Sequence, residues 1–161
     1  TRMRLHIHAG NFAQVLSLDQ ALAPVAPGIA NQVAEPEALF HRTMARLGLL
    51  LDGSAPPDAA ERVAADLAQM QAWRSLCEEN YGLRADILQT LHDALAGDRA
   101  AAAGQLARIV ALAPGDAAEW LGDRALALAF AARLDPAGPW RERAAQAYTA
   151  WGATALARLY A

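Results

Sequence analysis

The sequence predicts an all-α fold, organised as a right-handed α-solenoid of about four helical hairpins plus a C-terminal helix, in one domain over residues 1–161. Three observations carry this prediction. Alanine supplies 42 of the 161 residues and leucine is also prominent, whereas β-branched residues are sparse, a composition that favours helices. Glycines recur at a nearly constant interval, and helix-end signals fall where the apolar pattern breaks.

Four glycines, Gly10, Gly53, Gly97 and Gly138, each separate two helical patterns and follow one another at intervals of 43, 44 and 41 residues. A fixed period of about 20 to 50 residues is typical of helical solenoids. Glycine readily adopts the left-handed conformation that ends a helix. Each unit is therefore predicted to be a helix, a glycine turn and a second helix.

Helix-end signals and apolar spacing place the elements along the chain. The predicted helices cover residues 2–9, 11–23, 36–51, 57–76, 82–96, 99–112, 117–134, 139–151 and 153–160. Pro36, Pro57 and Pro139 stand where a first-turn proline is tolerated. Asp98 and Asp116 are predicted N-caps, because a carboxylate there accepts a hydrogen bond from an otherwise unpaired amide.

The third unit, GDRAAAAGQLARIVALAPGD, is similar to the second half of a tetratricopeptide repeat. Gly97 provides the turn, Ala102 is the small residue where helices cross closely, and Leu106 and Ile109 are apolar. The period is longer than the 34 or so residues of the standard unit. The hairpins are therefore predicted to be degenerate and tetratricopeptide-like.

Composition narrows the classes of partner. The net charge is −3 and all 14 basic residues are scattered arginines, so no nucleic-acid partner is expected. A single cysteine without CxxC spacing predicts neither a disulfide nor a structural zinc site. No apolar run approaches the roughly 20 residues of a membrane span and no signal peptide is recognisable, so a cytoplasmic protein with no membrane contact is expected. Helical patterning at both ends suggests a fragment of a longer protein.

The stretch MQAWRSLCEENYG combines residue types that occur in active sites, but it is predicted to be a joint between two helices. Trp73, Leu76 and Cys77 share one helix face, where an isolated cysteine is usually an inert small apolar residue. Asn80 is predicted to stop one helix or cap the next, with Tyr81 following as a packing residue.

The two carboxylates in this stretch, Glu78 and Glu79, are predicted to lie at a helix C-terminus, where the helix dipole slightly disfavours them. A salt bridge to Arg74 or Arg84, or a contact with a partner, would compensate.

No metal or cofactor is expected. The candidate metal ligands are His6, His8, Glu37, His41, His92 and Asp93. His6 and His8 would point about 200° apart on a helix, so they cannot share one ion. Glu37 and His41 could supply two ligands, but the paired ExxH motifs of helical-bundle metal sites are absent.

A remote alternative is an enzyme that uses Glu37, His41 and Cys77. A pairing of Cys77 with His92 as nucleophile and base is less favoured still, because no orienting carboxylate is evident.

Aromatic residues and arginines supply the candidate interaction surface. Trp120 and Trp140 lie close to predicted turns, which makes them candidates for a binding groove or for a contact with a neighbouring repeat. Arg124 and Arg141 lie near them in the sequence, on helix faces that are otherwise expected to be solvated. Arginine would clamp a carboxylate or phosphate if this surface bound one. The other aromatics, including Tyr148 and Trp151, are predicted to pack where helices meet.

The stretch from Gln71 to Ala113, together with the C-terminal YTAWGA, resembles the helical-repeat region of large bacterial signalling ATPases. In that family a STAND-type ATPase module joins a long helical array, often with Ser/Thr kinase-like or GAF and histidine-kinase domains. The residues that carry the resemblance are Trp73, Cys77, Glu79, Asn80, Tyr81, Gly97, Asp98, Tyr148, Trp151, Gly152 and Ala153. Glu78 departs from the family, which usually has proline there. The family's catalytic residues lie in other domains, and this chain has no GxxxxGK[ST] loop, so none carries over.

The resemblance implies a non-catalytic protein-interaction or regulatory module of a bacterial signal-transduction ATPase or kinase. Its expected partner is a protein or peptide, which could be another domain of the same parent chain, and self-association is compatible with the pattern. The alternative is a small-ligand sensor, as in helical transcription activators, which would need an apolar pocket with a few polar groups.

Overall fold

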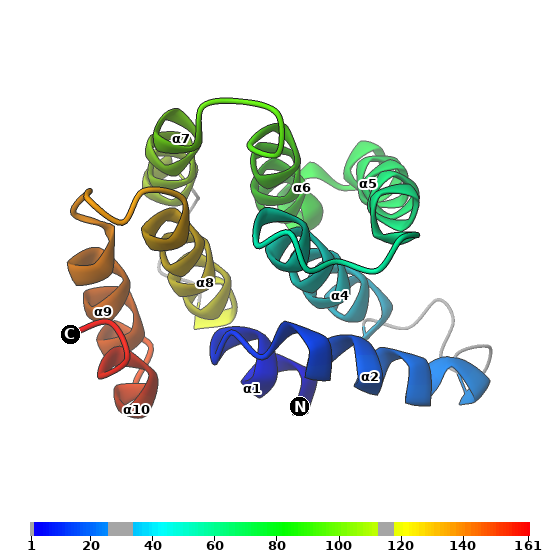
Figure 1. The fold of residues 1–161 in the computed structure, drawn as a ribbon, viewed down its shortest axis with the longest axis horizontal. Coiled ribbons are helices and arrows are strands. Elements are labelled where there is room, and N and C mark those ends of the chain that lie inside the picture. Colours follow the sequence, from blue (N-terminus) through cyan, green and yellow to red (C-terminus); the bar gives the residue numbers. More distant parts are fainter. Residues whose placement is uncertain (1, 26–33, 113–117) are drawn as a thin grey trace. The chain divides into compact units, whose positions relative to one another are not determined.

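The computed structural model describes residues 2–25, 34–112 and 118–161. These ranges contain nine α-helices and a short 3-10 helix and no strand, so the all-α prediction is confirmed there (Figure 1). The helices are α1 (Arg2–His8), α2 (Phe12–Leu22), α4 (Ala34–Leu51), α5 (Ala59–Leu76), α6 (Glu78–Asp93), α7 (Arg99–Leu112), α8 (Ala118–Leu134), α9 (Trp140–Ala150) and α10 (Thr154–Ala157), with η1 (Ala23–Val25) after α2. None of the described helices combines the length and the apolar character that crossing a bilayer requires. The arrangement as a solenoid, its handedness and the number of repeats stay predictions.

The chain divides into two compact units, Thr1–Leu88 and Gln89–Ala161, and the division falls within α6. Each unit is described by itself below. The prediction of a single domain is not tested by this division, because two units in one chain are compatible with either one folding domain or two.

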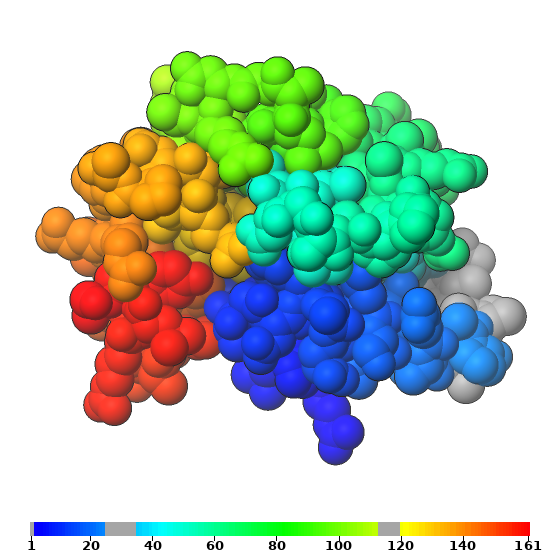
Figure 2. Space-filling model, viewed as in Figure 1, coloured from blue at the N-terminus to red at the C-terminus, as the bar shows by residue number. Residues whose placement is uncertain are grey.

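The first unit is organised around α4, which contacts α1, α2 and α5. Part of the surface of α4 that meets them is apolar, with Phe40, Met44 and Leu47 fully buried. Ile7 of α1 and Val15 of α2 are buried as well. In the space-filling view the side chains of α1 and α2 (blue) meet those of α4 (cyan) without an open channel on the face shown (Figure 2). Apolar residues three and four apart on α4 therefore build this core.

The second unit packs α8 between α7 and α9, and α10 returns against α9. Along α8 every residue from Ala125 to Ala132 is buried, as expected of a helix that is apolar on all sides. Tyr148 of α9 has no exposed surface and its ring stacks on Tyr160, with centroids 5.5 Å apart and an interplanar angle of 21°. Trp151 lies beside Tyr148 at 6.3 Å between centroids, which confirms both residues as packing residues.

All four periodic glycines lie between helices, but they end those helices in two ways. Gly10 and Gly53 have φ of 75° and 71°, and the residue after each donates a backbone hydrogen bond five positions back, from Asn11 to the His6 carbonyl and from Ser54 to the Leu49 carbonyl. This is the Schellman arrangement in which glycine avoids the strain of a left-handed residue. Gly152 forms the same arrangement with φ of 83°.

Gly97 and Gly138 are not left-handed, so the prediction of a left-handed turn is wrong at these two positions. At Gly97 and Gly138 a side chain would instead come too close to neighbouring atoms. A Cβ on Gly97 would lie 2.9 Å from the Asp93 carbonyl oxygen, and one on Gly138 would overlap the side chains of Asp135 and Trp140. The interval of 41 to 44 residues thus marks helix ends that differ in local structure.

Most predicted helix boundaries agree with the structure within two residues, and Asp98 caps α7 by accepting hydrogen bonds from the amides of Ala100 and Ala101 at 2.9 and 3.1 Å. Asp116 lies outside the described residues. Pro57 precedes the N-cap of α5 and Pro139 is itself the N-cap of α9, whereas Pro36 lies in the first turn of α4 as predicted.

The prediction that α6 begins at residue 82 is wrong, because it begins at Glu78 directly after Cys77. Cys77 is extended, with φ of −154° and ψ of 92°, and this one residue separates α5 from α6. Glu78 and Glu79 therefore lie in the first turn of a helix, where the dipole favours carboxylates, and not at a C-terminus. Asn80 lies inside α6 and caps neither helix.

Candidate functional site

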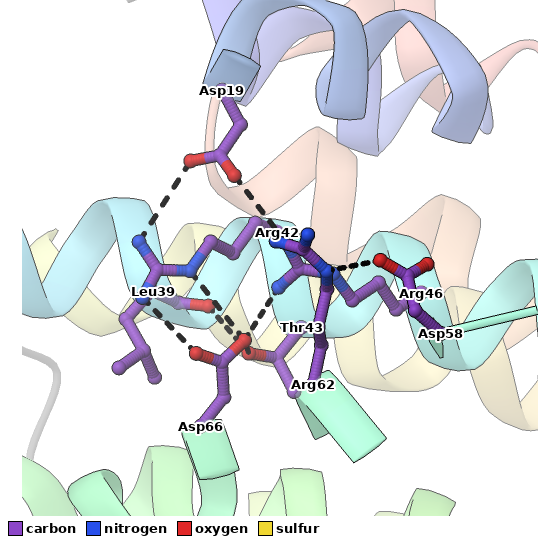
Figure 3. A network of polar contacts seen from close by, with 8 residues as sticks. All are labelled: Asp19, Leu39, Arg42, Thr43, Arg46, Asp58, Arg62 and Asp66. Atoms are coloured by element: carbon purple, nitrogen blue, oxygen red, sulfur yellow. Dashed lines mark hydrogen bonds and ion pairs between the residues drawn. The ribbon is translucent and has the colours of Figure 1, made fainter. Parts of the chain in front are cut away.

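An arginine–aspartate cluster in the first unit is formed by α2, α4 and α5 (Figure 3). Its centre is Asp66 of α5, which is 8% exposed. Arg46 Nη1 donates to Asp66 Oδ2 at 2.6 Å and Arg42 Nη2 donates to Asp66 Oδ1 at 3.0 Å. The Thr43 hydroxyl lies 2.8 Å from Asp66 Oδ2 and 2.7 Å from the Leu39 carbonyl oxygen, and it shares its single proton between them. Asp66 is thus fully satisfied by α4.

The second carboxylate of the cluster, Asp19 of α2, is held more loosely. Its oxygens lie 3.8 Å from Arg42 Nη1 and 3.5 Å from Arg46 Nη2. Hydrogen bonds between arginine and carboxylate are usually about 2.7–2.9 Å long. Asp19 therefore neutralises the arginine pair at a distance, while Asp66 binds it directly.

A pocket of about 420 Å³ opens beside this cluster. Its polar wall contains the two arginines and both aspartates with Glu35 and Arg62, and its apolar wall contains Leu22, Ala23, Ala38 and Ala65. Arg62 is 60% exposed at its side chain and pairs with Asp58 at 2.5 Å. The volume falls in the range of about 300–1,000 Å³ that small-molecule sites occupy.

Sequence reasoning did not identify this cluster, although a signal for it was present. Asp66 stands in the buried register of α5 with Val63, Leu67 and Met70, at i, i+3, i+4 and i+7. A carboxylate at such a position is rarely buried without a partner. Arg42 and Arg46 are four apart on α4, so they share a face and meet it together.

A second hollow lies along α9 in the second unit, with a volume of about 830 Å³. It is lined by Arg141, Glu142, Ala145, Gln146, Thr149, Ala150, Tyr160 and Ala161. The α9 residues among these recur at i, i+4 and i+8, so they form one stripe along the helix. Arg141 fixes one end of the groove by donating from Nη2 to the Leu159 carbonyl oxygen at 3.1 Å. We call this surface the α9 groove.

Of the four predicted surface residues, only Arg141 lines the α9 groove. Trp140 is half-buried, packs against a buried cluster of the second unit, and donates from Nε1 to Asp135 Oδ2 at 2.9 Å. The guanidinium of Arg143 lies 5.3 Å from its ring centroid. Trp120 and Arg124 are half-buried on α8. Trp140 is therefore engaged inside its own unit.

The stretch around Cys77 is a helix joint, as predicted. Trp73 and Tyr81 face each other across it, with ring centroids 5.9 Å apart. Arg74 binds Glu78 through Nε at 2.6 Å and Asp86 through Nη1 at 2.7 Å, which confirms the predicted salt bridge to Arg74. The hydrogen bond from Arg74 lowers the pKa of the Glu78 carboxyl below its usual range.

Leu76 of this joint lies differently from the prediction, whereas the role predicted for Ala102, a close crossing of helices, stays a prediction. Leu76 is 85% exposed, so it does not share a buried face with Trp73 and Cys77, which are half-buried. Ala102 is half-buried, whereas its neighbour Ala103 is fully buried on α7.

The residues that were weighed as candidate metal ligands or catalytic groups do not form a metal-binding group. Among the described residues, no three histidine, cysteine, aspartate or glutamate side chains lie close enough to hold one ion. His41 is 2% exposed, and burial, followed by the charges of neighbouring residues, lowers its pKa to about 3. Burial likewise lowers the pKa of His8 to about 4. His92 is half-exposed and lies 3.6 Å from Asp93.

Comparison of the chain with protein-family models, with curated proteins and with solved structures found no match.

Proposed function

We propose that this chain is a non-catalytic protein-interaction module that binds an α-helix of a partner protein in the α9 groove. The observation that carries the proposal is the stripe of small residues along α9. Ala145, Thr149 and Ala150 line this open groove together with Gln146, and its lining also includes the charged residues Arg141 and Glu142. Small side chains let a second helix approach closely, and the charged residues fix its direction.

The packing of α9 supports a helical occupant. Its opposite face is already used, since α9 contacts both α8 and α10 and buries Ala144 and Tyr148. The groove residues from Arg141 to Ala150 span about 14 Å at 1.5 Å per residue, the length of two and a half helical turns. An amphipathic helix with apolar residues at i, i+3, i+4 and i+7 would match this stripe.

A photo-crosslinking residue at Thr149 tests the proposal. We expect a crosslink to a specific protein in the native host, and none from the same residue placed at the exposed Ala101 of α7. The captured protein is then purified, and its affinity is measured for the unmodified chain and for T149R. Loss of binding with an unchanged circular dichroism spectrum and melting temperature supports the groove; equal affinities of the two chains reject it.

We further propose that the module serves a bacterial signalling ATPase or kinase, where occupation of the groove would bias a nucleotide-dependent switch. The support is the sequence resemblance around Cys77 and Tyr148. The test is the gene that encodes the parent protein: an encoded phosphate-binding loop or kinase signature supports this assignment. A complete parent protein without either rejects it.

A further inference from the structure

We infer that the pocket between α2, α4 and α5 is a binding site for a small organic carboxylate, whose carboxyl group replaces Asp19 across Arg42 and Arg46. This inference concerns the first unit and goes beyond the proposed role of the α9 groove.

Arg42 and Arg46 contact two carboxylates, Asp66 and Asp19, at clearly different distances. Asp66 receives its arginine hydrogen bonds at 2.6 and 3.0 Å, whereas the shortest arginine contact of Asp19 is 3.5 Å. Each guanidinium has five N–H donors in a planar fork, so one edge can bind Asp66 while another faces the pocket. Figure 3 shows Asp19 reaching these outer edges from the α2 side. A ligand carboxylate is not tied to α2, so it could approach Arg42 and Arg46 more closely than Asp19 does. It would then form hydrogen bonds of ordinary length with both arginines.

Burial makes this position favourable for an anion. The side chain of Arg46 is 8% exposed and that of Arg42 is 27% exposed, so their charges are poorly screened by water. Asp66 neutralises one of the two charges, and the second is left to Asp19. An incoming carboxylate would take over this role while Asp19, whose side chain is 22% exposed, turns toward water. The two guanidiniums would still face two carboxylates, those of Asp66 and the ligand, so their own charges would stay balanced.

The remaining wall of the pocket defines the rest of the ligand. Leu22, Ala23, Ala38 and Ala65 give the pocket an apolar surface beside the arginines, and Glu35 and Arg62 complete its lining. Inorganic anions would leave this surface unfilled, whereas a carboxylate with a short apolar body would cover it. The site is therefore matched to a small apolar carboxylic acid more closely than to a free phosphate.

Isothermal titration with butanoate tests the inference at constant ionic strength, using the unmodified chain, D19N, R42Q and D93N. D19N removes the competing carboxylate, so we expect it to bind butanoate about tenfold more tightly than the unmodified chain. D93N makes the same charge change at an exposed site of the second unit and should match the unmodified chain. R42Q should lose binding, and circular dichroism verifies that it is folded.

Two results would overturn the inference. One is the absence of butanoate binding to folded D19N at about 20 mM, a concentration well above the millimolar dissociation constants of weak ligands. The other is tighter binding of inorganic phosphate than of butanoate by D19N, which would assign the arginine pair to a phosphate group. Because the α9 groove takes no part in these measurements, failure here leaves the proposed interaction role untouched, and T149R should bind butanoate normally.

Discussion

Arg46 and Asp66 form a 2.6 Å ion pair between α4 and α5, although their whole-residue exposures are only 6% and 8%. Such a pair contributes little net stability when intact, because both charges lose their hydration on burial. Removing one partner of the pair is strongly destabilising, because the other charge then stays buried without its counterion. The cluster therefore fixes how α2, α4 and α5 fit together more than it strengthens the fold.

Removal of Asp66 should destabilise the protein strongly. We expect D66A to lower the free energy of unfolding by about 3 kcal/mol, because Arg46 keeps its charge with only the distant Asp19 to balance it. Urea unfolding measures the change, with D93A on the exposed side of α6 as the control. The double variant R46M/D66L should be more stable than D66A alone; a D66A protein as stable as the control would contradict this account.

Gly48 should be intolerant of even one added methyl group. It lies in α4 against Phe12, and a Cβ at Gly48 would overlap the Phe12 ring, which is 4% exposed and has little room to move. We expect G48A to cost about 1–3 kcal/mol of unfolding free energy through overpacking.

The matched control for Gly48 is Gly104 in α7. A Cβ there would meet only Arg108, at 3.9 Å, so G104A should stabilise the protein by about 0.5–1 kcal/mol through helix propensity. Thermal and urea unfolding of both variants give the comparison. Changes of the same sign at the two positions would rule out the packing explanation.

Gly53 tests backbone strain separately from packing. A Cβ at Gly53 would meet no heavy atom within 4 Å, so its φ of 71° is the only obstacle to a side chain. We expect G53A to lose about 1–2 kcal/mol and G53N to lose less, because asparagine tolerates the left-handed conformation better than alanine. Equal losses in the two variants would show that conformation at this residue is not the cause.

The sequence predicts the helices well because the signals that define them are local. Asp98 caps α7 through its own neighbours, and the apolar spacing of α4 and α8 identifies helices without knowledge of what they contact. The start of α6 was misplaced because its boundary is one extended residue, Cys77. No proline or glycine marks that break, and Asn80 offered a more conventional cap.

The arginine–aspartate cluster could not be predicted in the same way. Asp19, Arg42 and Asp66 come from three helices, and nothing local fixes their distances. The sequence does indicate that Asp66 lies among the buried positions of α5 and needs a partner. Which residue binds it depends on how α5 packs on α4. Trp120 and Trp140 are both half-buried, and their role at an interaction surface stays a prediction, because it too depends on contacts that local signals do not define.

Stability should fall between pH 7.5 and pH 5 because two histidines are buried without charge. The pKa of His8 is lowered to about 4 by burial and then by Arg4, and the pKa of His41 is lowered to about 3 by burial and then by His8, Arg84 and Arg4. Both values lie below the ordinary 6.5, so the unfolded chain takes up protons first as the pH falls. The stability that the neutral histidines contribute is complete above pH 6.5 and is lost as the pH approaches these folded-state values.

We expect each buried histidine to contribute about 1–2 kcal/mol to this loss between pH 7.5 and pH 5, where carboxylates remain largely ionised. Urea unfolding at the two pH values measures it, and H41L should show roughly half the pH dependence of the unmodified chain. H92Q, which alters a half-exposed histidine, should keep the full dependence. A pH dependence that H41L leaves intact would mean that protonation of His41 is not what weakens the fold in acid.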